Sequence, residues 1–193
     1  MTQLEEPQLL ETLLGTLFRP RRTFAELGPL TSSKHGGAGI ALLGMLWGLL
    51  SFLLWSSGRE PPFVFVPIPQ GQYYLVQGLC MLPLVTALWW LYSEVAFRLA
   101  GAGREPGTRT ALAFAYAVPM LVHVSLEMLV YLLGGFERLA PFTAVALPIA
   151  SLWVWALASL ALRELHGASW PRAIGASFAG LFVQAAAGAL ILR

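Results

Sequence analysis

The sequence has few charged residues, a single cysteine and no aspartate. Only 11% of its 193 residues are charged, whereas soluble domains average about 25%. A single cysteine, Cys80, excludes an intramolecular disulfide and any cysteine-rich metal motif. The chain also lacks a Walker loop, an H-E-x-x-H motif and a G-x-S-x-G motif. We therefore predict a protein that is not an enzyme and that holds neither a metal nor a cofactor.

Hydrophobic residues make up 57% of the chain and are gathered into five long blocks. The blocks cover residues 37–57, 73–97, 110–133, 140–162 and 173–192. At ~1.5 Å per residue, each is long enough as a helix to cross a hydrocarbon layer of ~30 Å. A soluble core of such helices would need amphipathic partners to cover it, and only the first thirty or so residues are amphipathic. The sequence predicts an all-α, polytopic membrane protein with a bundle of five transmembrane helices.

The positive charges are unevenly distributed among the connections between these blocks. Cytoplasmic loops carry the excess of Lys and Arg, so a cytoplasmic N-terminus places most of the cations on one side. The cytoplasmic set is then Arg19, Arg21, Arg22, Lys34, Arg98, Arg104, Arg109, Arg163 and Arg172. The outer set is Arg59, Arg138 and Arg193. This bias predicts a cytoplasmic N-terminus and an outer C-terminus, and it explains the net charge of +2 without a nucleic-acid partner.

Residues 1–36 form a separate N-terminal cytoplasmic region, and the membrane domain follows as 37–193. Leucines and a phenylalanine at helical spacing form an apolar stripe, which predicts an amphipathic helix: Leu10, Leu13, Leu14, Leu17 and Phe18. The opposite side carries Glu11, Thr12 and Thr16. Such a helix either lies in the interface of the cytoplasmic leaflet or packs under the bundle.

A basic cluster of Arg19, Arg21 and Arg22 follows this helix, and Pro20 interrupts it. Thr23 and Glu26 have the spacing of a capping box, which predicts that a second short helix begins there. Basic side chains at this depth bind anionic lipid headgroups. We therefore expect the three arginines to contact the anionic cytoplasmic leaflet.

The fifth block carries small residues one helical turn apart. Gly175 and Ala179, like Ala176 and Gly180, have the small-x-x-x-small spacing that lets helix backbones approach closely in lipid. Gln184 lies one turn from both Gly180 and Gly188, so its amide is expected to bond across a close helix interface. The spacing is equally compatible with a contact within the chain and with a contact between two copies of the chain.

Ionisable residues inside the blocks are the best candidates for a functional site, because charge near the bilayer centre is costly. Glu94 and Arg98 lie near the cytoplasmic end of the second block at a spacing that allows an ion pair. In the third block, one helical face carries Tyr116, Met120, His123, Glu127 and Tyr131.

His123 falls near the bilayer midplane, and Pro119 frees a backbone carbonyl close by. One hypothesis is an intramembrane site for a proton, ion or small ligand that uses His123, Glu127 and Tyr116. The other is a hydrogen-bonded pair that fixes helix packing, with Gln77, Glu94 or Gln184 as its partner across a dry contact. A metal site is less favoured, because two ligands on one helix do not complete a coordination sphere.

Three stretches resemble the Yip-one domain family, the Ypt/Rab-interacting proteins with five membrane spans and a cytoplasmic N-terminus. They are Leu17-Phe-Arg-Pro-Arg-Arg-Thr-Phe-Ala-Glu-Leu27, Phe97-Arg-Leu-Ala-Gly-Ala-Gly103 leading into Thr110-Ala-Leu-Ala-Phe-Ala-Tyr-Ala-Val-Pro119, and Leu160-Ala-Leu-Arg-Glu-Leu-His-Gly-Ala-Ser169. With their spacing they cover roughly residues 10–190. The chain lacks the long cytoplasmic tail and the Asp-Leu-Tyr-Gly-Pro motif of the eukaryotic relatives, and it is similar to the shorter bacterial members.

The resemblance implies a noncatalytic protein, with the bacterial inner membrane as its location. Eukaryotic relatives act in vesicle trafficking and bind small GTPases of the Rab type, whereas the shorter form here leaves GTPase binding open. Two functions are compatible with the sequence. The first is a scaffold or adaptor that organises lipids, other membrane proteins or copies of itself through Arg19, Arg21 and Arg22. The second is a small transporter or permeation path for a proton, ion or lipid through the polar face of the third block.

Overall fold

The computed structural model describes residues 8–28, 34–61, 67–102 and 105–192, with the side chains of 190–192 left out. All regular structure in these segments is helical, as predicted. The elements are α1 (Leu9–Phe18), α2 (Pro20–Leu27), α3 (Lys34–Ser56), α4 (Gln70–Ala100), α5 (Pro106–Gly134), the short 3-10 helix η1 (Phe136–Arg138), α6 (Leu139–His166) and α7 (Trp170–Leu192). Arg104 and Arg193, which entered the charge argument, lie outside the described residues.

Within the described residues, four helical segments are long and apolar enough to cross a membrane. They are Lys34–Ser56, Gln70–Ala100, Pro106–Gly134 and Phe136–His166. Each contains one of the first four predicted blocks almost entirely and extends it by a few residues. α7 covers the fifth block as a single helix of 23 residues. Its role as a fifth span stays a prediction.

Apolar side chains cover the outside of the helices, while several polar ones are buried inside. Trp90 of α4, Ile149 of α6 and Phe182 of α7 are each at least half exposed. Thr110 of α5 and Ser159 of α6 are almost fully buried. Large exposed apolar surfaces are rare on monomeric soluble proteins. This distribution is what lipid as the surrounding solvent requires.

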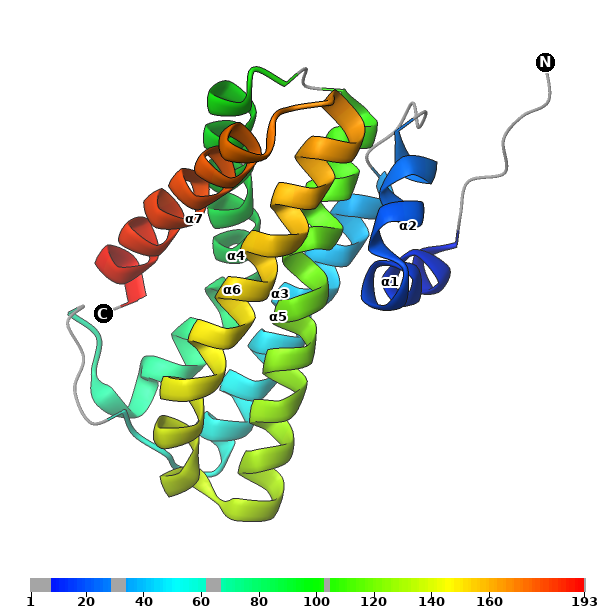
Figure 1. Cartoon of the computed structure of the whole chain (residues 1–193). Coiled ribbons are helices and arrows are strands. Elements are labelled where there is room, and N and C mark those ends of the chain that lie inside the picture. Colours follow the sequence, from blue (N-terminus) through cyan, green and yellow to red (C-terminus); the bar gives the residue numbers. More distant parts are fainter. Residues whose placement is uncertain (1–7, 29–33, 62–66, 103–104, 193) are drawn as a thin grey trace.

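The five long helices form a ring in which each packs mainly against two neighbours. α3 packs against α4 and α5, α5 packs against α6, and α7 closes the ring between α4 and α6. α7 leans outward from the others towards its C-terminal end (Figure 1). α3 and α4 approach closely at two glycines of α3: a Cβ atom on Gly44 would lie 2.8 Å from the Leu82 Cα, and one on Gly48 would lie 3.0 Å from the Gly78 carbonyl oxygen. Gly44 and Gly48 form the spacing that permits such contacts in lipid.

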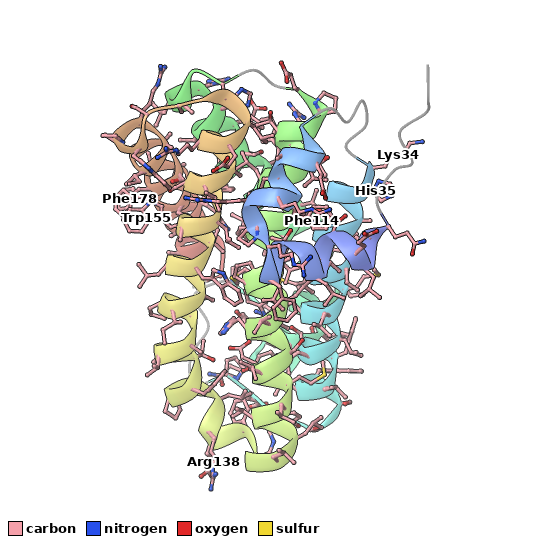
Figure 2. The ribbon with its side chains drawn as sticks, turned by 45° about the vertical axis from the view of Figure 1, so that its right-hand side comes forward. Lys34, His35, Phe114, Arg138, Trp155 and Phe178 are labelled. Carbon is pink, nitrogen blue, oxygen red and sulfur yellow. The ribbon has the colours of Figure 1, made fainter. Side chains whose placement is uncertain are left out.

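The two ends of the bundle differ in charge. At one end of the bundle, α4 connects to α5 and α6 connects to α7, and we call this end the basic end. It carries Lys34, Arg98, Arg109, Arg163 and Arg172. Arg59 and Arg138 lie at the opposite end, and Figure 2 shows Arg138 far from Lys34. Gly101 and Gly167 end α4 and α6 at the basic end with φ of 64° and 59°, which a residue with a Cβ rarely adopts.

The N-terminal helices lie against the side of the ring near the basic end (Figures 1 and 2). α2 begins at Pro20 rather than at Thr23, so the predicted capping box is wrong. Proline suits the first turn of a helix because the missing N–H has no partner there in any case. The Thr23 hydroxyl donates to the Arg19 carbonyl oxygen at 3.1 Å instead of capping a helix that starts after it.

α1 turns its threonines towards the protein and part of its apolar stripe outward. Thr12 and Thr16 are buried at 2% and 0% exposure, whereas Leu10, Leu14 and Phe18 are 66%, 48% and 73% exposed. Leu13 and Leu17, on the flank of the stripe, pack partly against the core. The stripe is therefore divided between the bundle and the surroundings.

Candidate functional site

The polar residues of the third predicted span lie along α5 and divide into two groups. His123 and Glu127 form the first group, in the half of α5 that lies away from the basic end. The His123 Nε2 and Glu127 Oε1 atoms are 3.4 Å apart, and both side chains are buried. Thr143 of α6 donates a hydrogen bond to Glu127 Oε1. The pair therefore connects α5 to α6.

The surroundings of this cluster are closed and mainly apolar. The imidazole of His123 stacks on Phe142 of α6, with ring centroids 6.3 Å apart and planes at 8°. Neither ring nitrogen of His123 has a hydrogen-bond partner among the described residues. Of the partners expected across a dry contact, Gln77 accepts a hydrogen bond from Ser51, and Gln184 bonds to Tyr116. The side chain that bonds Glu127 across the helix contact is therefore Thr143, and not one of these predicted partners. The choice between a packing role and a functional role for His123 and Glu127 stays a prediction.

Tyr116 forms the second group, together with the α7 residue Gln184. The Gln184 amide nitrogen donates to the Tyr116 hydroxyl at 2.6 Å. The other amide atom of Gln184 is buried and has no partner among the described residues. Tyr92 of α4 lies beside this pair, with its ring centroid 5.9 Å from that of Tyr116. The structure thus brings Tyr116 to α7 and His123 with Glu127 to α6, so the three predicted residues do not form one site.

An apolar groove opens beside the Tyr116–Gln184 pair, and we call it the lateral groove. All five helices of the ring line it, from Trp47 of α3 through Leu88 and Met120 to Leu152 and Phe182, and its volume is about 760 Å³. Near the basic end α6 and α7 are joined, because Ser159 and Ser177 share a hydrogen bond of 2.6 Å. Trp155 and Phe178 also meet there, as Figure 2 shows (ring centroids 5.6 Å apart).

The ionisable residues of α4 have a partner on a neighbouring helix. Arg109 of α5 donates to a carboxylate oxygen of Glu94 at 3.0 Å and lies over the Phe97 ring, 5.9 Å from its centroid. Glu94 is buried, and Arg98, which the sequence predicts as its partner, is exposed at the basic end. The pair formed with Arg109 connects α4 to α5 near their shared connection.

The small residues of α7 differ in what they contact. A Cβ on Gly180 would lie 2.8 Å from both the Tyr92 ring and the Tyr92 carbonyl oxygen, so α7 approaches the α4 backbone there. Gly188 faces Leu88 at an ordinary distance, and Ala179 is partly buried. A Cβ on Gly175 would meet nothing within 4 Å. The close approach of α7 is therefore centred on Gly180.

The basic cluster lies on α2 and just before it, on the outside of the bundle. Arg19, Arg21 and Arg22 are all exposed. Arg21 lies 3.6 Å from a carboxylate oxygen of Glu164 in α6, and Arg22 donates to Glu26 at 2.7 Å. The hydrogen bond from Arg22 to Glu26 raises the pKa of Arg22 above its ordinary value. Exposed ion pairs of this kind contribute little to stability.

A family model described as the Yip1 domain matches residues 14–192 of the chain. The match begins in α1, includes α2 and the whole ring, and ends with α7. The chain belongs to the Yip1 domain family. No curated protein and no solved structure matches it. Family membership and the long apolar helices together identify this Yip1 domain as an integral membrane protein.

Several contacts that position the helices of this Yip1 domain were not predicted from the sequence. Thr143 is a lone threonine in an apolar helix, and no periodicity points to its bond with Glu127. Thr108 and His166 meet at 2.7 Å between the start of α5 and the end of α6, 58 positions apart. The contact of α3 with α4 at Gly48 did have a signal, namely the Gly44-x-x-x-Gly48 spacing.

Metal-binding residue types are sparse in this Yip1 domain. Among the residues that the structure describes, no group of three or more His, Cys, Asp or Glu side chains is placed to hold a metal ion. The neighbour that bonds Glu127 is Thr143, whose hydroxyl is a poor metal ligand beside carboxylate and imidazole. The cluster's geometry serves contact between helices.

Proposed function

We propose that this Yip1 domain is a noncatalytic scaffold or adaptor that organises lipids or partner proteins at the cytoplasmic face of its membrane. In this proposal α7 is a fifth span, the basic end is cytoplasmic and the C-terminus is outside. The excess of Lys and Arg at one end of the bundle supports this orientation. The membrane is proposed to be the bacterial inner membrane, on the likeness to the short bacterial members.

The observation that carries the proposal is the surface of α1 and α2. Exposed Leu10, Leu14 and Phe18 suit the acyl boundary of a bilayer, and the arginines that follow suit its anionic headgroups. Thr12 and Thr16 are buried, and α1 packs against α3 and α5 of the ring. The two helices are therefore positioned to lie along the leaflet and to present a basic surface at its edge.

The buried polar cluster on α5 supports a structural role for the membrane domain. Glu127 lies between His123 of its own helix and Thr143 of α6, and neither His123 nor Glu127 lines the lateral groove. A transporter would need these groups to meet water from each side in turn. Transport through this face is the less supported function.

The proposal is tested by the lipids that the protein retains. After reconstitution with equal amounts of anionic phosphatidylglycerol and neutral phosphatidylcholine, we expect the purified protein to retain the anionic lipid preferentially, as counted by native mass spectrometry. Replacing Arg19, Arg21 and Arg22 together by Ala should reduce this preference roughly tenfold.

The matched control removes exposed charge from the opposite end of the bundle. Arg59→Ala combined with Arg138→Ala should leave the preference unchanged, because neither residue belongs to the basic cluster. An unchanged preference in the triple variant, or an equal loss in the control, would argue against the proposal.

A further inference from the structure

The lateral groove has the size of a ligand site and a lining without charge. Its volume of about 760 Å³ lies within the ~300–1,000 Å³ range of small-molecule sites. Its lining contains no Asp, Glu, Lys, Arg or His among the described residues. A charged headgroup would lose its hydration there and gain no opposite charge, which is costly. The groove therefore selects a neutral, mainly apolar molecule.

The opening of the groove faces the region that the hydrocarbon of the bilayer would occupy. Leu152 of α6 and Phe182 of α7 lie at its edges and are 59% and 66% exposed. α7 leans away from the ring beyond its contacts with α6 at Trp155 and Ser159 (Figure 1). A molecule dissolved in the bilayer would thus enter sideways between α6 and α7, without passing through water.

One polar group in the wall lacks a hydrogen-bond partner. The Gln184 side chain lines the groove, and one atom of its amide bonds the Tyr116 hydroxyl. The other amide atom is unpartnered and buried, so it meets a molecule in the groove only when the side chain turns. The terminal amide torsion of glutamine is broad, and either orientation of the amide leaves one atom without a partner. An unsatisfied polar atom in this environment costs free energy. A hydroxyl satisfies it in both orientations, because a hydroxyl both donates and accepts.

The polar pair lies deep in the bundle. Tyr116 is six residues from the start of the apolar block at Thr110, so at ~1.5 Å per residue it lies about 9 Å inside the edge of the hydrocarbon nearer the basic end. That depth is well within a hydrocarbon layer of ~30 Å. A phospholipid headgroup in its usual position does not reach it, whereas the hydroxyl of a molecule held within the hydrocarbon does.

From these observations we infer that the lateral groove binds a neutral lipid with a long apolar chain and a terminal hydroxyl, a long-chain alcohol in chemical class. The chain fills the groove between α6 and α7, and the hydroxyl bonds to the unpartnered amide atom of Gln184. This inference does not depend on the scaffold function, since none of the residues concerned belongs to α1 or α2.

The test uses two photoreactive probes that differ only in the hydroxyl. Diazirine derivatives of hexadecanol and of hexadecane are added to the full chain in lipid nanodiscs, and the labelled peptides are quantified by mass spectrometry. We expect the alcohol to label the groove peptides of α5 and α7 at least about threefold more than the alkane. Gln184→Leu should abolish this difference.

Two further variants separate the groove from its polar group. Ser151→Ala is the matched control: Ser151 also lines the groove, but its hydroxyl donates to the Leu147 carbonyl oxygen of its own helix at 2.8 Å, so the preference for the alcohol should persist. Ala185→Trp, which fills the groove from an exposed position on α7, should lower labelling by both probes.

Several results would overturn the inference. They are equal labelling of the wild-type protein by both probes, a preference that survives Gln184→Leu, or labelling that Ala185→Trp does not change. Crosslinks between two copies through groove residues, without probe labelling, would assign the groove to a second copy of the chain. The arginine triple variant tests whether the groove and the scaffold function are independent. If this variant loses its preference for anionic lipid but keeps its preference for the alcohol, the two sites are independent.

Discussion

At the scale of single residues, several polar side chains of the membrane domain join two helices. Glu127 contacts Thr143 across α5 and α6, Glu94 contacts Arg109 across α4 and α5, and Tyr116 contacts Gln184 across α5 and α7. In lipid, water does not compete for these groups, so a polar contact specifies which helices are neighbours and in which rotation. On this interpretation, Tyr116 and Glu127 of α5 specify the neighbours of that helix.

The contact between Thr143 and Glu127 predicts a measurable loss of stability. Thr143→Val keeps the shape of the side chain and removes the donor to Glu127, so we expect a loss of about 0.6–2 kcal/mol in unfolding free energy. Ser159→Ala is the comparison at the α6–α7 contact, where Ser177 retains its bonds to the carbonyl oxygens of α7 and the loss should be smaller. Denaturant titration in mixed micelles measures both. Equal stability of Thr143→Val and the wild type would refute the packing interpretation.

A conduction role for the same residues makes the opposite prediction. If the cluster only joins helices, Glu127→Gln in sealed liposomes leaves proton and ion flux at the background of protein-free liposomes, as does the wild type. A wild-type flux above this background that falls in Glu127→Gln would reverse the assignment. A pH-sensitive dye inside the liposomes reports the proton flux.

A contact could be predicted only where its residues form a recognisable pattern in the sequence. The polar face of α5 was visible in the spacing of Tyr116, His123 and Glu127. Their partners were not, because Thr143 and Gln184 lie on other helices and no local spacing encodes a contact between helices. Arg109 was predicted as a cytoplasmic charge, yet the choice between Arg98 and Arg109 as a partner for Glu94 depends on how α4 and α5 rotate about their connection.

At the scale of helices, the close approach of α7 to α4 at Gly180 predicts a difference between two equal substitutions. Gly180→Ala places a methyl against the Tyr92 ring and carbonyl oxygen, and overpacking of this kind costs about 1–3 kcal/mol. Gly175→Ala on the same helix meets nothing within 4 Å and should be neutral or slightly stabilising. The difference in stability between the two variants reports the packing at Gly180, because both substitutions change helix propensity equally. Equal melting temperatures for the two variants in detergent would place the contact elsewhere.

The exposed apolar residues of α1 predict how that helix responds to loss of one leucine. Leu14→Ser removes part of the surface proposed to enter the bilayer, so hydrogen exchange of the α1 amides in nanodiscs should rise roughly tenfold. Glu11→Ser, which changes an exposed charged residue on the same helix, should leave exchange nearly unchanged. Similar exchange in both variants would mean that α1 is held by the bundle alone.

The helix boundaries were the most predictable part of the structure, and the rotation of α1 was the least. The predicted block 110–133 lies within α5 (Pro106–Gly134), because a long apolar run has few ways to satisfy its backbone in lipid other than a helix. The stripe on α1 did indicate a helix, but its two flanks have different neighbours. A periodicity that marks one side as apolar does not distinguish a lipid from a protein contact.

At the scale of the whole molecule, the ring of five helices combines a basic end, a lipid-facing surface and an apolar groove open to the side. The first four predicted spans correspond to helices long enough to cross a membrane among the described residues, and α7 completes the ring between α4 and α6. If α7 also crosses, the chain ends on the side opposite its N-terminus. The scaffold proposal needs α1 and α2 on the cytoplasmic side, so the topology is the claim on which the account depends.

Topology is measured most directly by the reaction of single cysteines with a membrane-impermeant maleimide in sealed cells. In a Cys80→Ser background, we predict that Glu60→Cys, Glu137→Cys and a cysteine appended after Arg193 react from outside. Glu105→Cys and Glu11→Cys should react only after permeabilisation. A C-terminal cysteine protected together with Glu105→Cys, or an N-terminal region labelled in sealed cells, would contradict the five-span topology with a cytoplasmic basic face.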